Sequence, residues 1–210
     1  MRVTSVVAAI VLPAIALPKA VSAQAEQRNL RGGHVSIYNL AGHLRAMPGT
    51  GDAVMVEITR RGADRDKLRI ETGTVRDRET LRIVYPSDRI VYPALRTRTR
   101  VTMRVREDGT FSDEGWTRDS RDEIEIRDSG SGLEAFADVV VRVPRGQKID
   151  LYLGAGRVEV ANVEGDILID VAAAEVDVSG TKGNLSLDTG SGKVAVREVP
   201  FRAEIGRAHV

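Results

Sequence analysis

The chain has 210 residues, which is enough for one domain or two small ones. Hydrophobic residues make up 42% and charged residues 29%, a composition that excludes a wholly disordered chain. The formal net charge of +1 argues against a dedicated nucleic-acid-binding protein. The sequence contains no cysteine, which excludes disulfides, iron–sulfur clusters and cysteine-ligated zinc.

Residues 1–23 have the three-part pattern of a secretory signal peptide. Arg2 precedes an apolar stretch from Val6 to Leu17, and the small residues Val21-Ser22-Ala23 form a cleavage site. The alternative is a membrane anchor, but the stretch is about a dozen residues, short of the ~20 that span a bilayer. We therefore expect cleavage after Ala23, a linker over residues 24–32 and no later transmembrane span. The mature chain would reach the periplasm, the cell surface or the exterior.

Residues 33–203 read as short strands separated by turns and are expected to form a single all-β domain. Apolar residues alternate with polar ones, as at Val54, Val56 and Ile58, and this period of two is typical of half-buried strands. Pro48-Gly49 and Gly62 mark turns between such runs. No window shows a sustained helical period.

One strand carries a row of arginines. A period of two over residues 96–106 puts the apolar side chains on one face and the arginines on the other: Arg96, Arg98, Arg100, Arg104 and Arg106. This row is a candidate site for a polyanion such as a surface polysaccharide or lipid phosphate. The alternative is a solvated sheet face balanced by Glu123 and Glu125, and the near-zero net charge favours this alternative.

Pairs of apolar residues recur every nine positions in the last third of the chain, from Ile149 and Leu151 to Val194 and Val196, with glycines between them. Nine residues hold one short strand and one turn, and two such units make an 18-residue coil. Invariant spacing is typical of a coil that stacks on itself. We therefore predict a parallel β-solenoid with 18-residue coils over residues 149–203, preceded by less regular β coils or hairpins. The predicted core includes Val158, Val160, Ile167, Ile169, Val176, Val178, Leu185 and Leu187.

Three segments resemble the bacterial putative-adhesin family: VSIYNLAG at residues 35–42, VPRG at 143–146 and LDTGSGKV at 187–194. The resemblance covers most of the mature chain and is strongest from Ala135 on. It implies an exported β-repeat domain, and it brings no catalytic residues, because none is established for the family.

Catalytic and metal-binding motifs are incomplete. Asp188-Thr189-Gly190-Ser191 matches the tetrad of aspartic proteases, but that chemistry needs two such loops. Asp170 and Asp188 occupy the same position of successive repeats, so either a cation lies between them or both are solvated. His34 and His43 have no third ligand nearby and are expected in surface turns. The sequence therefore predicts no catalytic residue, no metal site and no cofactor.

The last seven residues, 204–210, resemble a translated sequencing adapter. We expect them to add no strand to the sheet, and we expect the natural protein to continue with further coils. The open end of the predicted solenoid would then be an apolar edge able to self-associate.

These features predict an exported, non-enzymatic β-repeat protein of the bacterial envelope or exterior, acting as an adhesin-like or structural module. Its partner would be an unknown surface polymer or protein, and not a nucleic acid. The alternative is a polysaccharide-active enzyme, a lyase or hydrolase, on a β-helix scaffold. A cleft with paired carboxylates and a nearby Arg or Lys would favour the enzyme.

Overall fold

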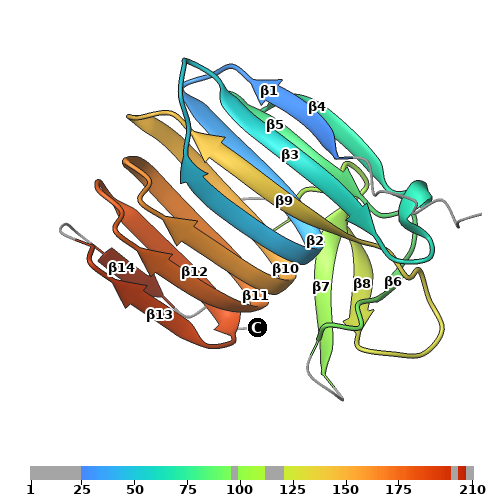
Figure 1. Ribbon diagram of the computed structural model, residues 1–210. Helices are drawn as coiled ribbons and strands as arrows, with labels where there is room; N and C mark the ends of the chain where they lie inside the picture. The colour runs from blue at the N-terminus through green and yellow to red at the C-terminus, as the bar shows by residue number, and fades with distance from the viewer. Residues whose placement is uncertain (1–24, 96–98, 112–120, 200–202, 207–210) are drawn as a thin grey trace, which may run out of the picture.

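The computed structural model describes residues 25–95, 99–111, 121–199 and 203–206, which form an all-β fold of two sheets. Figure 1 shows a large sheet and, beside it, a smaller sheet at the lower right. The large sheet contains β1 (Glu26–Leu30), β2 (His34–Pro48), β3 (Val54–Arg61), β4 (Arg69–Val75), β5 (Arg78–Val84), β9 (Phe136–Val143), β10 (Gln147–Ala161), β11 (Gly165–Ser179), β12 (Leu185–Ser191), β13 (Val194–Arg197) and β14 (Ala203–Gly206). The smaller sheet contains β6 (Arg89–Val91), β7 (Arg100–Arg106) and β8 (Arg121–Arg127). A short 3₁₀ helix, Arg65–Lys67, follows β3.

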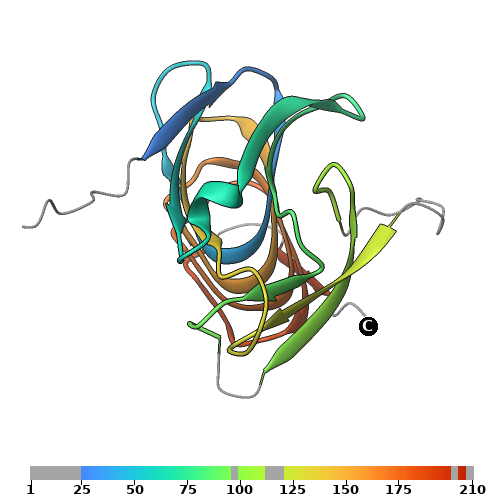
Figure 2. The ribbon, with the colours of Figure 1, turned by 90° about the vertical axis from the view of Figure 1, so that its right-hand side faces the viewer.

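The parallel strands of the large sheet keep a constant register over the last third of the chain. Ile149 lies opposite Ile167 and Ile167 opposite Leu185, a step of 18 residues. The same step relates β13 to β11 and β14 to β12. Figure 2 shows the long strands bending in the same way, one behind another, around the core.

The prediction of a regular parallel β-solenoid is wrong. The large sheet is mixed, because β1 pairs antiparallel with β3, β3 with β9 and β4 with β5. The 18-residue step holds only over residues 147–206, and before it parallel pairs of β2 with β5 and β9 are mixed with antiparallel pairs. The nine-residue spacing does not separate one strand from the next, because β10 and β11 are single 15-residue strands that bend midway. Two successive apolar pairs therefore belong to the two halves of one strand.

Two boundaries also differ from expectation. Residues 26–30, expected in a linker, form β1, an edge strand of mostly polar residues anchored by Leu30, which is buried, and by an ion pair of 2.5 Å between Glu26 and Arg60. Residues 204–206, expected to add no strand, continue the parallel pairing of β14 with β12. Backbone hydrogen bonds do not depend on particular side chains, so this segment can pair with the free edge of β12. The predicted signal peptide, residues 1–23, lies outside the described residues.

The predicted core is confirmed. All eight predicted side chains are buried in one hydrophobic cluster, which also includes residues from β2, β3, β5 and β9. Val194 and Val196 of β13, the next pair along the chain, are half-buried and pack against that cluster. The alternation within each strand half thus decides which side chains enter the core.

The strands bend at a column of small residues. A Cβ on Gly156 would lie 1.9 Å from the carbonyl oxygen of Gly42, and one on Gly192 would lie 1.9 Å from that of Ala174. Gly42, Gly156 and Gly192 all have φ between 131° and 135°. The backbones approach so closely at this column that a side chain on these glycines would separate the strands.

A second column has left-handed backbone. Asn162, Gly180 and Glu198, 18 residues apart, have φ of 57°, 61° and 53°. Each comes directly after the last residue of a strand, β10, β11 or β13, and these three strand ends are in register with one another. A left-handed conformation costs an ordinary L-residue about 1–2 kcal/mol, so Glu198 is strained where Gly180 is not.

We predict that Glu198→Gly raises the free energy of unfolding by about 0.5–1 kcal/mol, because glycine adopts this conformation without strain. Gly180→Ala should lower it, since its Cβ would also lie 2.4 Å from Asn162 Oδ1. Ser186→Gly, at an exposed strand position, is the matched control and should not stabilise. Urea unfolding of the three variants checks this; a destabilised Glu198→Gly would contradict it.

Candidate functional site

A groove with a volume of about 510 Å³ lies where the large sheet meets the linker between β6 and β7. Its floor is the bend of the large sheet, formed by Gly156, Ala173, Ala174 and Gly192. The close backbone approach at this column keeps the floor free of side chains larger than a methyl group. The groove therefore runs across the strands of β10, β11 and the segment joining β12 to β13.

The wall on the side of the smaller sheet is largely apolar. It is formed by Tyr92, Ala94, Leu95 and Thr99. Tyr92 is buried and packs edge-on against Phe136, with ring centroids 5.0 Å apart. Burial, reinforced by the negative charge of Asp138, raises the pKa of the Tyr92 phenol, so this ring stays neutral and acts as a fixed wall.

Packing of the smaller sheet positions that wall. Val101 and Val105 of β7 are buried, and Met103 reaches the large sheet at Gly154. A Cβ on Gly154 would lie 2.6 Å from the Leu40 carbonyl oxygen and 2.8 Å from Met103 Sδ. Glycine at position 154 thus lets the two sheets approach closely enough to enclose the groove.

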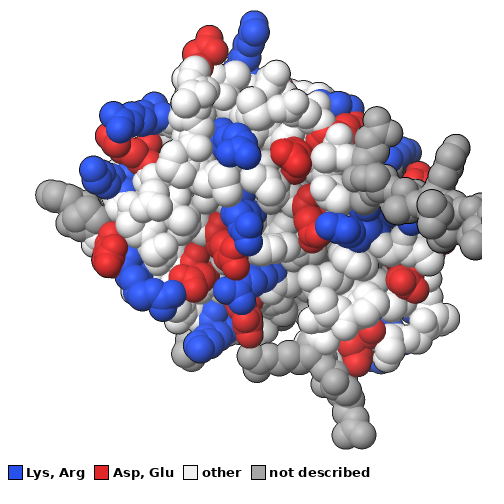
Figure 3. All heavy atoms as spheres, in the orientation of Figure 1, with Lys and Arg blue, Asp and Glu red and all other residues white. Residues whose placement is uncertain are grey.

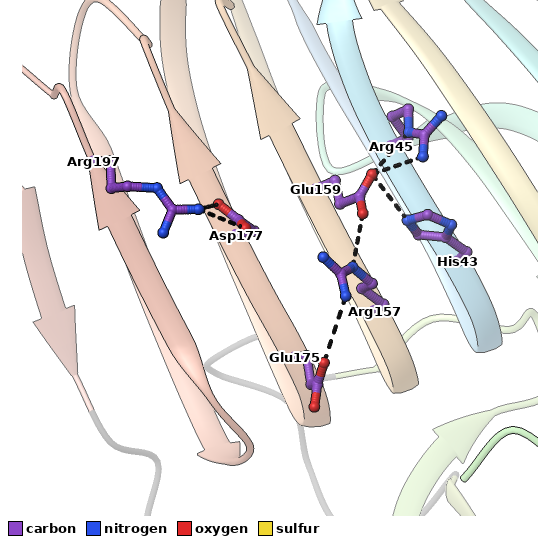
Figure 4. A network of polar contacts seen from close by, with 7 residues as sticks. All are labelled: His43, Arg45, Arg157, Glu159, Glu175, Asp177 and Arg197. Atoms are coloured by element: carbon purple, nitrogen blue, oxygen red, sulfur yellow. Dashed lines mark hydrogen bonds and ion pairs between the residues drawn. The ribbon is translucent and has the colours of Figure 1, made fainter.

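The opposite wall carries charged side chains from the outer face of the large sheet. His43, Arg157 and Glu175 line the groove, and Ser191, whose hydroxyl donates to the Ala172 carbonyl at 3.3 Å, lies at its end. Figure 4 shows that these charges belong to a network crossing β2, β10, β11 and β13.

Glu159 is the centre of this network. Its carboxylate accepts hydrogen bonds from Arg45 at 2.9 Å and Arg157 at 2.7 Å, and His43 Nε2 lies 3.4 Å away. Burial alone would raise the pKa of Glu159, but the Arg45 hydrogen bond and the charges of His43, Arg45 and Arg157 outweigh it and hold the pKa below its ordinary value. The carboxyl is therefore ionised at neutral pH.

The remaining charges are paired in the same way. Arg157 also contacts Glu175 at 3.6 Å, and Arg197 donates to both oxygens of Asp177 at 2.9 and 2.8 Å. Positive and negative side chains are interspersed over this face of the molecule (Figure 3). The groove wall is charged but close to neutral in sum.

Only some arginines of the predicted row lie on the exposed face of β7. Arg100 and Arg104 are exposed on β7, whereas Arg106 is buried and donates to Thr110 Oγ1 at 2.9 Å. Arg96 and Arg98 lie outside the described residues. Arg106 turns inward because it closes the turn that also pairs its backbone N–H with the Thr110 carbonyl.

Acidic residues of β8 lie opposite the exposed arginines. Arg104 is in register with Glu123, and Arg100 forms an ion pair with Glu125. A hydrogen bond from Arg127, with the nearby charges of Arg100 and Arg89, lowers the pKa of Glu125. The arrangement matches the balanced sheet face that the sequence left open as an alternative, while polyanion binding stays a prediction.

Sequence reasoning missed a buried cluster around Asp150. Its Oδ2 receives His34 Nε2 at 2.6 Å, the Ser36 hydroxyl at 3.0 Å and Arg78 at 3.0 Å, while its side chain is only 2% exposed. The cluster contains a serine, a histidine and an aspartate, yet the buried Ser36 donates to Asp150 and not to His34. We conclude that it is no nucleophilic triad, because the base does not contact the hydroxyl.

Aromatic rings cover this cluster. Tyr152, which accepts a hydrogen bond from Arg78 at 3.2 Å, stacks on Tyr38 with ring centroids 4.3 Å apart, and Phe111 packs edge-on against both. Asp150 Oδ1 has no hydrogen-bond partner among the described residues. The rings exclude water from a carboxylate that depends on His34, Ser36 and Arg78.

The other candidate ligands lie on strands of the large sheet. His34 and His43, expected in turns, both lie in β2. Asp170 and Asp188 are side by side on β11 and β12. The described part of the chain contains no group of three or more His, Asp or Glu that could hold a metal ion. Within the same residues, no helix is long and apolar enough to cross a membrane.

Comparison with known proteins does not assign this chain to a family. No protein-family model and no curated protein sequence matches the chain. A crystal structure described as a putative cell adhesion protein from Clostridium sporogenes matches 88% of this chain and 96% of that chain, at 8% identity and a TM-score of 0.38. A similarity this distant carries no argument for function, so the resemblance to the adhesin family stays a prediction.

We predict that Asp150→Asn lowers the free energy of unfolding by about 3 kcal/mol, because it removes the buried negative charge on which His34, Ser36 and Arg78 converge. Asp166→Asn, an exposed carboxylate that accepts hydrogen bonds from Asn184, is the control and should cost about 1 kcal/mol or less. Urea unfolding at neutral pH measures both. Equal effects of the two substitutions would contradict the role assigned to Asp150.

We predict that part of the stability is lost as the pH falls through the folded-state pKa of Glu159. In the unfolded chain this carboxyl takes up its proton near its ordinary value of 4.5, and in the folded protein only at lower pH. Between these two values the unfolded state binds more protons, so stability falls with falling pH. Glu159→Gln should flatten this dependence in urea unfolding between about pH 5 and pH 3. An unchanged slope would refute the assignment.

Proposed function

We propose that this protein is an exported, non-enzymatic interaction module that holds an extended surface polymer in the groove beside the bend of its large sheet. The observation that carries the proposal is the groove itself: an open floor without large side chains, with the large sheet on one side and Tyr92, Ala94, Leu95 and Thr99 on the other. Concave sites of this size with a few polar groups are the usual places for ligands. The signal-peptide pattern of residues 1–23 and the resemblance to exported adhesin-like domains support a place outside the cytoplasm.

The state of the carboxylates favours binding over catalysis. A glycosidase-type acid needs a raised pKa and a second carboxylate close by. Glu175, which lines the groove, is paired with Arg157, and behind it Glu159 has a lowered pKa. Both carboxylates hold an arginine in place, and the lowered pKa of Glu159 does not suit it to donate a proton.

We predict that Ser191→Trp, which fills the end of the groove, weakens polymer binding by about tenfold or more, equivalent to 1.4 kcal/mol. Ser179→Trp, at the end of β11 outside the groove, is the matched control and should bind as the native protein does. Binding is measured on immobilised cellulose, chitin, pectin, dextran sulfate, fibronectin and collagen, with thermal unfolding to confirm that both variants are folded.

Two results would contradict the proposal. One is a ligand that binds all three proteins equally, which would place the binding surface elsewhere. The other is release of reducing ends or unsaturated sugars from any of the polysaccharides, lost in Glu175→Gln, which would favour the enzyme.

A further inference from the structure

We infer that Met47 is a modification site, at which a peroxide oxidises the thioether to a sulfoxide under the control of Arg142. The site lies on the outer face of the large sheet and is independent of the groove. Met47 is the residue before the last one of β2 and is half-buried, whereas Ala46 before it is buried in the core. Because side chains alternate along a strand, the thioether of Met47 faces away from the core.

Arg142 lies between two thioethers on this face. It is on β9, in register with Met47 of β2 on one side and with Met55 of β3 on the other, and Figure 1 shows β3, β9 and β2 side by side. Arg142 Nη1 donates to Met47 Sδ at 3.3 Å, an exposed contact. No carboxylate of the described residues forms an ion pair with Arg142. The guanidinium is therefore held by a sulfur atom, which is a weak acceptor.

The hydrogen bond gives the two lone pairs of the sulfur different roles. One lone pair accepts from Arg142, and the other attacks one oxygen of hydrogen peroxide. The O–O bond breaks, the S–O bond forms, and the second oxygen leaves as water with both hydrogens. Sulfur loses two electrons and the peroxide gains them, which yields methionine sulfoxide. Since the oxygen is added to one side of the sulfur, one of the two sulfoxide epimers is favoured.

The product suits its surroundings better than the thioether does. A sulfoxide is polar, and its oxygen accepts hydrogen bonds that a thioether accepts only weakly. Hydrogen bonds from a charged donor such as a guanidinium are the strong ones. Oxidation of Met47 thus gives Arg142 a better partner and leaves the core closed, because the side chain already lies outside it. The modification is reversible by sulfoxide reductases.

Two other methionines provide internal comparisons. Met55 is half-buried on the same face and beside the same arginine, but Arg142 donates to Met47 and not to Met55 among the described hydrogen bonds. Met103 lies between the two sheets, where a Cβ on Gly154 would be 2.8 Å from its Sδ. Met55 therefore reports oxidation at the surface without the hydrogen bond, and Met103 reports oxidation of an enclosed thioether.

Hydrogen peroxide treatment of the full chain tests this inference. Peptide mass spectrometry follows each methionine, and the two epimer-specific sulfoxide reductases measure the epimers in the digest. We expect Met47 to be oxidised at least about fivefold faster than Met103, with one epimer of Met47 in at least about threefold excess and the epimers of Met55 about equal. Arg142→Val should make the Met47 epimers about equal, and Arg142→Lys, which keeps a charged donor, should restore an excess.

Arg197→Val is the matched control. It removes an exposed arginine of β13 that is paired with Asp177, and it should leave the epimer ratio at Met47 unchanged. Equal epimers at Met47 in the native protein would overturn the inference, as would an excess that persists in Arg142→Val or oxidation of Met47 no faster than that of Met103. The comparison of Met47 with Met55 needs no variant, so it tests the inference even if Arg142→Val does not fold.

Discussion

Close backbone approach at the bend of the large sheet is the constraint on which the other features depend. A Cβ on Gly42 would lie 2.0 Å from the carbonyl oxygen of Ala137, and a Cβ on Gly156 or Gly192 would meet the carbonyl oxygen of a neighbouring strand in the same way. Because the strands bend together at this column, their two halves fold over one core. The same approach leaves the outside of the bend bare. One geometric requirement thus closes the core and clears the floor of the groove.

The outer face beyond the bend has a different character. Arginines and carboxylates from neighbouring strands interlock there, with Glu159 receiving two guanidinium groups. Exposed ion pairs of this kind contribute little to stability singly. Their effect is to remove net charge and to hold long side chains in fixed positions. A ligand meets a wall that is ordered and nearly neutral, so shape and hydrogen bonding would select it more than attraction at a distance.

The sequence pattern predicted the core but not the path of the chain. The nine-residue spacing identified buried residues such as Val158 and Ile169, because alternation within a strand depends only on near neighbours. The same spacing fits separate strands and one bent strand equally, so it could not reveal that β10 is continuous. Before residue 147 the nine-residue spacing is absent, and the alternation within single strands did not show which of them pair parallel and which antiparallel.

The sites were harder still to predict. His34 and Asp150 are 116 residues apart, and no local motif links them. One groove wall comes from Tyr92, Ala94, Leu95 and Thr99, which no local motif marks as a binding site, and the floor is formed by glycines and alanines. In the parallel pair of β10 and β2, Lys148 lies opposite His34 and Asp150 opposite Ser36. This register brings His34 and Ser36 close to Asp150, but it is known only once the two strands are paired.

The 18-residue register also sets the unit in which this part of the chain can change length. Removing residues 165–182 would bring Leu185 to the place of Ile167, opposite Ile149, with each inward side chain still facing inward. Removing one residue would exchange the two faces of every strand that follows, since side chains alternate. A change of 18 residues would therefore keep the inward side chains facing inward, and an added step of this length would extend the floor of the groove by one strand spacing.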